Sequence, residues 1–302
     1  MSTSETELQD TLAAYEKYLV DSGLSQVTIT GYLGDIKQFA SWLAGEGRTS
    51  LLAGTSQEIR RYCLQLVIAK AHTPATVNRR LQAIRKFFRF AVHTGLVDED
   101  ASLGIKLLPQ PPSEGPRGLD RSEVERLLDA VRRGAPRLMK RDYAIVQLML
   151  QTGIRVGELT KLKLCDISLF EDKRVLRVRG QEASQGREIP LNSSARKALG
   201  AYLDERVGST NDHLFLSRKG EPLSVRSVQR LVNTYAQAAG LEDVSTYTLR
   251  QTYGQQMLRD TGDLSLVARL MGHKRLETAI KYILPGQEDL TEIAERSSLN
   301  VY

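Results

Sequence analysis

Cysteine is scarce in this 302-residue sequence: Cys63 and Cys165 are the only two, too few for a disulfide framework. No group of cysteines and histidines has the spacing of a zinc site, so we expect no metal. No uninterrupted apolar run is long enough to span a bilayer, and the polar segment Ser2 to Asp10 lacks the pattern of a secretory signal. We therefore expect a soluble, cytoplasmic protein with no membrane partner.

Acidic residues are absent between Glu58 and Asp98, although the whole chain is nearly balanced, with 42 Lys and Arg against 36 Asp and Glu. The basic residues in this gap are Arg60, Arg61, Lys70, Arg79, Arg80, Arg85, Lys86 and Arg89. The formal net charge of +6 and the pI near 9.3 favour an anionic partner without naming it. Charge of one sign gathered in one segment indicates a localised anion-binding surface.

The chain is longer than a usual single domain, and its prolines indicate where it divides. Four of the nine prolines lie between Leu108 and Pro116, in a stretch that can neither continue a helix nor donate to a sheet. We predict a helical first domain at 1–107, a linker at 108–117, a second domain at 118–284 and a C-terminal tail at 285–302.

Four segments of the first domain carry apolar residues at three- and four-residue steps, which predicts amphipathic helices. They are Leu8 to Leu19, Thr28 to Leu43, Ser56 to Ala69 and Pro74 to Thr94. The last has the clearest ends, because Thr73 is a typical N-cap, Pro74 suits the first helical position and Gly95 is a typical stop. Its predicted buried stripe consists of Val77, Leu81, Ile84, Phe88 and Ala91.

Another face of this helix carries hydrogen-bond donors and no acidic residue. Arg79, Gln82, Lys86 and Arg89 recur there at helical spacing. An ordinary solvated face usually mixes charges of both signs, whereas a helix that follows phosphates or enters a major groove presents donors. We predict Arg79, Arg80, Lys86 and Arg89 as DNA contacts, with a solvated face as the alternative.

The second domain alternates helical patterns with one short β section. Strand patterns at Arg174 to Arg179 and Arg187 to Leu191 flank the polar loop Gly180 to Gly186, which predicts a hairpin with a long tip. The predicted helices are Asp120 to Val131, Lys140 to Gln151, Ser194 to Leu203, Ser224 to Ala239, Leu249 to Arg259 and Leu264 to Met271. The predicted fold class is therefore mainly α with a small antiparallel β-sheet.

Three separated segments of this domain carry side chains suited to phosphate chemistry. They are Gln151 to Leu159, Tyr247 to Thr252 and Leu270 to Tyr282. Each has an ordinary interpretation when taken alone: Arg155 as a surface charge, His273 as a helix cap, and Tyr282 as a core aromatic.

Together and in this order, the three segments resemble the catalytic domain of the tyrosine recombinase/phage-integrase family, in its Xer-like bacterial branch. In the last segment Gly272-His273 precedes Tyr282 by the family's nine residues (282 − 273 = 9). The resemblance covers nearly the whole chain, because Tyr15 to Leu43 and Thr73 to Leu96 are similar to the family's core-binding domain. It implies a two-domain fold, with a helical core-binding (SAM-like) domain followed by an α/β catalytic domain.

The resemblance implies a site-specific recombinase, integrase or resolvase, that cleaves and rejoins duplex DNA through a 3′-phosphotyrosyl intermediate. Tyr282 matches the nucleophile, Arg155 and Arg250 the two catalytic arginines, His273 a phosphate-binding histidine, and Glu158 an accessory acid. Guanidinium groups suit this role because they are permanently charged and bind two phosphate oxygens as a fork. The phosphotyrosyl bond conserves the bond energy, so no cofactor is expected. The expected assembly is a homo- or hetero-tetramer on DNA, in which the tail docks on a neighbouring protomer.

Two positions depart from the family pattern. Tyr247 stands where the family has a histidine, and Gln181 where it has a hairpin lysine that acts as general acid. These departures keep open an alternative, a catalytically attenuated DNA-binding relative that supports or regulates an active recombinase. A metal-dependent nuclease or transposase is disfavoured, because no acidic cluster stands beside the arginines. The DNA target, and the choice between chromosome-dimer resolution and movement of a mobile element, stay open.

Overall fold

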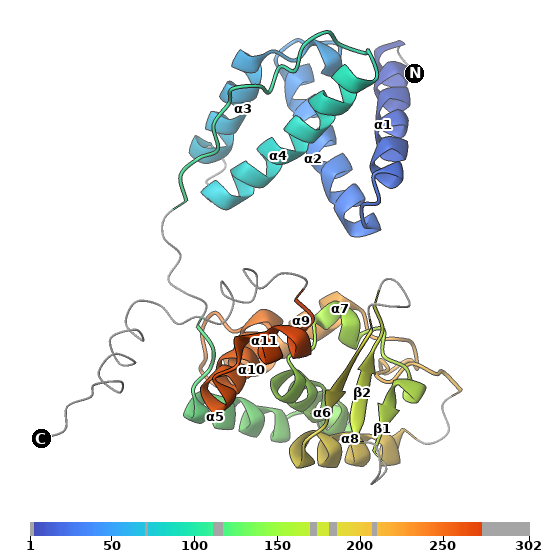
Figure 1. The fold of residues 1–302 in the computed structure, drawn as a ribbon, viewed down its shortest axis with the longest axis vertical. Helices are drawn as coiled ribbons and strands as arrows, with labels where there is room; N and C mark the ends of the chain where they lie inside the picture. Colours follow the sequence, from blue (N-terminus) through green and yellow to red (C-terminus); the bar gives the residue numbers. More distant parts are fainter. Residues whose placement is uncertain are drawn as a thin grey trace, which may run out of the picture. The chain divides into compact units, whose positions relative to one another are not determined.

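The computed structural model of the chain forms two compact units, Met1–Pro112 and Ser113–Tyr302 (Figure 1). The structure describes residues 3–69, 72–110, 117–169, 174–180, 186–206 and 210–273. The division between the units falls inside the segment 108–117 that the prolines mark as a linker. Among the helices of the described ranges, none is long and apolar enough to cross a membrane.

The first unit is a bundle of four α-helices with one short 3₁₀ turn. Its elements are α1 (Thr3–Asp21), α2 (Gln26–Gly45), η1 (Leu51–Ala53), α3 (Ser56–Ile68) and α4 (Pro74–His93). All four expected helices are present, and α1, α2 and α3 each pack against α4. The Thr73 hydroxyl accepts a hydrogen bond from the Thr76 N–H, and Pro74 occupies the first turn, as the sequence predicts.

Helix α4 lies at the centre of this unit because its buried face is broad. The stripe from Val77 to Ala91 is buried as expected, and Phe87 and Phe90 are buried as well. The Tyr15 ring of α1 lies with its centroid 5.3 Å from that of Phe87 and 5.2 Å from that of Phe90. Aromatic contacts between α1 and α4 therefore form much of the core.

The second unit is mainly helical with a three-stranded antiparallel sheet in the order β1-β2-β3 (Figure 1). Its helices are α5 (Arg121–Arg132), α6 (Pro136–Thr152), α7 (Val156–Leu159), η2 (Leu164–Asp166), α8 (Ser193–Glu205), α9 (Val225–Ala238), α10 (Thr246–Thr261) and α11 (Leu264–Met271). Its strands are β1 (Ile167–Ser168), β2 (Val175–Val178) and β3 (Arg187–Pro190). The expected hairpin is β2–β3, whereas the two-residue β1 and one-turn α7 are too short to give a periodic pattern.

Helix α6 is the centre of the second core and packs against α5, α8 and α10. Its residues from Ala144 to Leu150 are all buried, as is typical of a helix enclosed by others. Helix α6 ends at Gly153, whose φ of +59° is left-handed. A Cβ at Gly153 would collide with the Tyr253 ring of α10, so the end of α6 and the face of α10 are in close contact.

The core of the first unit allows a direct test, because the only tryptophan, Trp42, lies in that unit. Replacing Phe87 by alanine removes a fully buried ring and should lower the free energy of unfolding of this unit by about 3–5 kcal/mol. Trp42 fluorescence during urea unfolding measures this change. The control Val92→Ala, at an exposed site of the same helix, should stay within about 0.5 kcal/mol of the unchanged protein. Equal effects of the two changes would contradict the central place of Phe87.

Candidate active site

Arg250 connects the ends of two helices. It lies on α10, and only 4% of the residue is exposed. Its Nη1 donates to the Gly153 carbonyl at the end of α6, and its Nη2 donates to the Met271 carbonyl of α11 at 2.7 Å. The same Nη2 lies 2.9 Å from Nε2 of His273. Arg250 thus brings together segments that are more than a hundred residues apart in the chain.

Arg155 reaches the same place from the N-cap position of α7. It follows the turn at Gly153, and its Nη2 donates to the Gly272 carbonyl at 2.7 Å. Its Nη1 donates to Glu158 Oε1 at 3.1 Å, while its backbone N–H donates to Glu158 Oε2 at 2.9 Å. The side chain stays 43% exposed, so an anion from solvent can reach this guanidinium.

Glu158 is held from both sides by arginines. Arg187, the first residue of β3, donates from Nη1 and Nη2 to the two carboxylate oxygens at 2.9 Å each. Burial alone would raise the pKa of Glu158, but hydrogen bonds and charge from Arg187 and Arg155 outweigh it and lower that pKa to about 2. Glu158 is therefore ionised throughout the physiological pH range and serves to orient its two arginines.

Three consecutive carbonyls at the C-terminal end of α11 each accept a bond from a different arginine. Arg187 Nε donates to the Leu270 carbonyl at 2.7 Å, Arg250 to that of Met271 and Arg155 to that of Gly272. The last carbonyls of a helix have no partner within the helix, and this end carries partial negative charge. The three arginines therefore satisfy and electrostatically complement the end of α11.

His273 directly follows this helix end and is neutral at pH 7. Burial, reinforced by the charges of Arg250, Arg155 and Arg187, lowers the pKa of His273 from 6.5 to about 4, although the Glu158 charge opposes the shift. A guanidinium cannot accept a hydrogen bond, so Nε2 accepts from Arg250 and the ring proton resides on Nδ1. His273 is therefore a neutral donor next to two arginines.

We call Arg155, Glu158, Arg187, Arg250 and His273 the arginine cluster. Three guanidinium groups against one carboxylate give it a formal charge of +2 at neutral pH, with His273 neutral (3 − 1 = 2). A positive site with a partly exposed arginine suits an anion such as a phosphodiester. Within the part of the chain that the structure describes, no group of three or more His, Cys, Asp or Glu is placed to hold a metal ion.

The other expected site residues are placed in part. Tyr247 lies in the first turn of α10, 43% exposed, three residues before Arg250 and so on the same side of the helix. Tyr282 and Gln181 lie outside the described residues, as does the tail 285–302.

Arg187 is the residue of the cluster that the sequence analysis missed as a site residue. A signal was present, because side chains alternate along a strand and Arg187 shares a face with the buried Ile189. An arginine on the inward face of a strand needs a partner, which here is Glu158.

The basic face of α4 differs in part from the expectation. Arg79 donates to both carboxylate oxygens of the buried Asp35, with Nη2 and Oδ1 2.8 Å apart. The Lys86 ammonium lies over the Tyr18 ring, and Arg89 is exposed. The prediction that Arg80 contacts DNA gains no support, because Arg80 is 9% exposed and its Nη1 lies 3.3 Å from the Tyr62 hydroxyl. Its position three residues after Val77 and four before Ile84 puts it on the apolar side.

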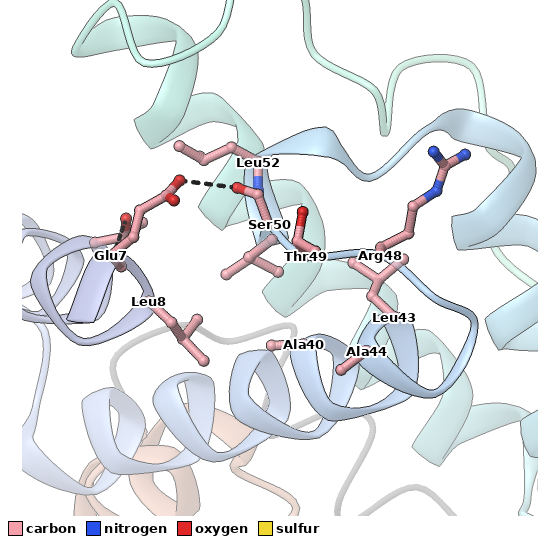
Figure 2. Close-up of a pocket in the computed structure, with 11 residues that line it drawn as sticks. Glu7, Leu8, Ala40, Leu43, Ala44, Arg48, Thr49, Ser50 and Leu52 are labelled. Carbon is pink, nitrogen blue, oxygen red and sulfur yellow. Dashed lines mark hydrogen bonds between the residues drawn. The ribbon is translucent and has the colours of Figure 1, made fainter. Parts of the chain in front are cut away.

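A pocket of about 380 Å³ lies in the first unit between α1, α2 and the turn that follows α2 (Figure 2). Its walls include the apolar Leu8 and Leu43, and Glu7 accepts a hydrogen bond from the Ser50 hydroxyl at 3.0 Å. None of the expected site residues lines it. The chemistry of the chain is therefore assigned to the arginine cluster.

The pKa of His273 is directly measurable by NMR, with its resonance assigned by loss in His273→Gln. We expect a titration midpoint near 4, because burial and three arginines disfavour the charged ring. Since this folded pKa is below the unfolded value, the unfolded chain takes up the proton first. The contribution of His273 to stability is therefore present above pH 6.5 and is lost as the pH falls toward 4. A midpoint near 6.5 would show that the cluster does not surround the ring as described.

Comparison with known proteins identifies the family. The model of the phage integrase family matches residues 117–287, more than half of the chain, and that of the phage integrase N-terminal SAM-like domain matches residues 12–95. Tyrosine recombinase XerD of Bifidobacterium longum (strain NCC 2705) is 32% identical over 286 residues, covering 90% of this chain and 91% of that protein.

Two solved structures share the fold. XerH site-specific recombinase, bound to palindromic difH substrate in a post-cleavage complex, matches with a TM-score of 0.73 at 21% identity, covering 89% of this chain and 79% of its own. A lambda integrase tetramer bound to a Holliday junction matches with a TM-score of 0.73 at 21% identity, covering 92% of this chain and 77% of its own. The expected fold and the resemblance are confirmed, and the chain belongs to the phage integrase family, as a tyrosine recombinase of the Xer-like branch.

Proposed function

We propose that this site-specific recombinase cleaves and rejoins duplex DNA through a covalent 3′-phosphotyrosyl bond to Tyr282. Arg155, Arg250 and His273 bind the scissile phosphate. The observation that carries the proposal is the convergence of these three side chains at the end of α11, nine residues before Tyr282. Side chains from α7, α10 and the end of α11 meet there although they are far apart in the sequence.

The proposed reaction exchanges one phosphorus–oxygen bond for another. The phenolic oxygen of Tyr282 bonds to phosphorus, the bond to the 5′ oxygen breaks, the phenolic proton passes to a base, and the 5′ oxygen gains a proton. Attack by the 5′ hydroxyl of another strand reverses these steps. The two arginines stabilise the negative charge that develops on the phosphate oxygens, and the Nδ1 proton of His273 is the hydrogen-bond donor that the neutral ring retains.

The cluster is arranged before any phosphate arrives. Glu158 and the carbonyls of α11 hold Arg155 and Arg250, so little reorganisation is needed when the phosphate binds. An anion near the arginines offsets their charge and so raises the pKa of His273 from its low value. Phosphate binding and protonation of His273 are therefore coupled.

Proton transfer to the departing 5′ oxygen is the weaker part of the proposed site. Gln181 cannot supply a proton as the family's lysine does, and general acids contribute roughly 10²–10⁴-fold. Tyr247 is a poor base at pH 7 but its hydroxyl can donate to a phosphate oxygen. These two residues favour the second candidate function, a DNA-binding relative with attenuated catalysis that supports an active recombinase.

The partners follow from the same fold and charge. XerH and lambda integrase are bound to DNA in the structures that share this fold, the latter as a tetramer. We extend this to the present chain, in which Arg79, Lys86 and Arg89 of α4 contact DNA. Four protomers assemble on the duplex. The protein acts in the cytoplasm, where the chromosome lies. The domain limits 1–107, 108–117, 118–284 and 285–302 belong to this proposal.

A nicked suicide duplex tests the nucleophile, because the released strand diffuses away and the covalent adduct accumulates. The wild-type chain should form an adduct that denaturing gels resolve, and Tyr282→Phe, which lacks the attacking oxygen, should form none while binding DNA normally. An adduct of undiminished yield with Tyr282→Phe would falsify the assignment. Specific binding without any wild-type adduct would instead favour the attenuated relative.

The contribution of α4 is tested best at Arg89, because replacing Arg79 would also leave the buried Asp35 without its partner. Arg89→Ala should weaken DNA binding and flatten the slope of log K against log salt by about one unit, the loss expected for one phosphate contact. Lys17→Ala, at an exposed position of α1, is the control. If both variants leave the slope unchanged, the face of α4 is an ordinary solvated face.

A further inference from the structure

Arg187 is engaged through all three nitrogens of its guanidinium group. Nε donates to the Leu270 carbonyl at 2.7 Å, and Nη1 and Nη2 donate to the two oxygens of Glu158 at 2.9 Å each. Its side chain is 14% exposed, against 43% for Arg155. Because the fork of Arg187 is occupied by a carboxylate, this arginine is not placed as a phosphate ligand.

Arg187 lies between the β2–β3 hairpin and the end of α11. It begins β3 and pairs with Val178 of β2, so it lies at the base of the β2–β3 hairpin. On its other side it binds the last turn of α11, directly before His273 and the segment that leads to Tyr282. One side chain therefore joins the base of the hairpin to the end of α11, which directly precedes His273.

We propose that Arg187 is a positioning residue, which fastens the C-terminal end of α11 directly to the base of the β2–β3 hairpin and connects both to Arg155 through Glu158. It thereby fixes where His273 lies relative to Arg155 and the hairpin. The role deepens the proposed strand cleavage and rests on it. Arg187 itself touches no reacting atom.

The chemistry of this position requires an arginine. The planar guanidinium group donates two hydrogen bonds to the Glu158 carboxylate and, from Nε, a third to the Leu270 carbonyl. The ammonium group of a lysine is a single point of charge and cannot reproduce this paired geometry. Loss of the guanidinium would leave the Leu270 carbonyl without this donor and the half-buried Glu158 with Arg155 as its only arginine. The Glu158 side chain would then be free to move together with Arg155. The end of α11 would also lose its hydrogen bond to the hairpin.

Gly272 supplies an independent observation of the same contact. Its φ is +66°, and a Cβ built there would lie 2.7 Å from Nη1 and 2.9 Å from Cζ of Arg187. Gly262, at the end of α10, has the same φ of +66° but nothing within 4 Å of such a Cβ. The two glycines therefore share the backbone strain of an alanine substitution, and only Gly272 adds a collision with Arg187.

The first experiment compares Arg187→Met and Arg187→Lys with Arg177→Met in the full-length chain. Arg177 is the matched control, because it lies on the same hairpin and pairs with Glu188 in an exposed ion pair. In Arg187→Met, adduct formation on the suicide duplex should fall about 10²-fold, the cost typical of a misplacement of about 1 Å. DNA binding should persist, Arg187→Lys should restore only part of the rate, and Arg177→Met should match the wild type.

The pKa of His273 in the folded variants separates a positioning role from a general loss of stability, because lower stability alone does not change the charges around the ring. In folded Arg187→Met it should rise from about 4 toward 6.5, because one of the three surrounding positive charges is gone and the ring is less enclosed. The charges of Arg250 and Arg155 should keep it below 6.5, with Glu158 opposing them. Arg177→Met should leave it unchanged.

The second experiment compares Gly272→Ala with Gly262→Ala and stays decisive if Arg187→Met fails to fold. Gly272→Ala should lower the rate of adduct formation and raise the pKa of His273, whereas Gly262→Ala should change neither. In the Arg187→Lys background, whose smaller head group relieves the collision, Gly272→Ala should have a smaller effect than in the wild-type background. Such non-additivity is the signature of two residues in contact.

Two results would overturn the positioning role. One is a folded Arg187→Met that forms the adduct at the wild-type rate with the pKa of His273 unmoved. The other is an equal effect of alanine at Gly272 and Gly262. Failure of the proposed function is recognised separately. If the wild-type chain forms no adduct through Tyr282, the pKa of His273 in the variants still tests the positioning role of Arg187.

Discussion

The carbonyl groups at the end of α11 are the constraint on which the site depends. A helix of eight residues ends there with carbonyls that need donors, and Arg155, Arg187 and Arg250 provide them from distant parts of the chain. Three guanidinium groups so close together repel one another in the absence of an anion. The helix end and Glu158 offset this repulsion, so the arginines stay in place before a phosphate arrives.

The same arrangement explains why His273 is neutral. A histidine at a helix C-terminus ordinarily gains a higher pKa from the partial negative charge of the helix. Here the three arginines bind the carbonyls at that end of the helix. The ring is buried next to their positive charges, and both effects lower its pKa to about 4. Burial and the arginines together keep His273 neutral, and the arginines also hold the helix end that precedes it, so a change in one of them alters both.

The elements with strong local signals were predictable from the sequence. Amphipathic periodicity gave the helices, and Thr73 and Pro74 gave the start of α4. The resemblance to the family singled out Arg155, Arg250 and His273, which the fold brings together at the end of α11. The role of Arg187 was not predictable in this way, because its partners Glu158 and Leu270 are distant in sequence and only the fold brings them together. Arg80 differs in kind: its charge favoured a DNA contact, but its helical position already places it beside the buried Val77 and Ile84.

The arginine cluster and the hairpin tip serve separate parts of the proposed reaction. The cluster stabilises charge on the phosphate, and each of its bonds is independent of the residue at position 181. In the proposed reaction the departing 5′ oxygen needs a proton, which the amide of Gln181 is poorly suited to supply. Slow proton transfer would therefore leave the binding of the phosphate by the arginines intact. Because Arg187 bonds both Glu158 and the Leu270 carbonyl from the first residue of β3, a displacement of the base of the hairpin would be transmitted to the end of α11 and to Glu158.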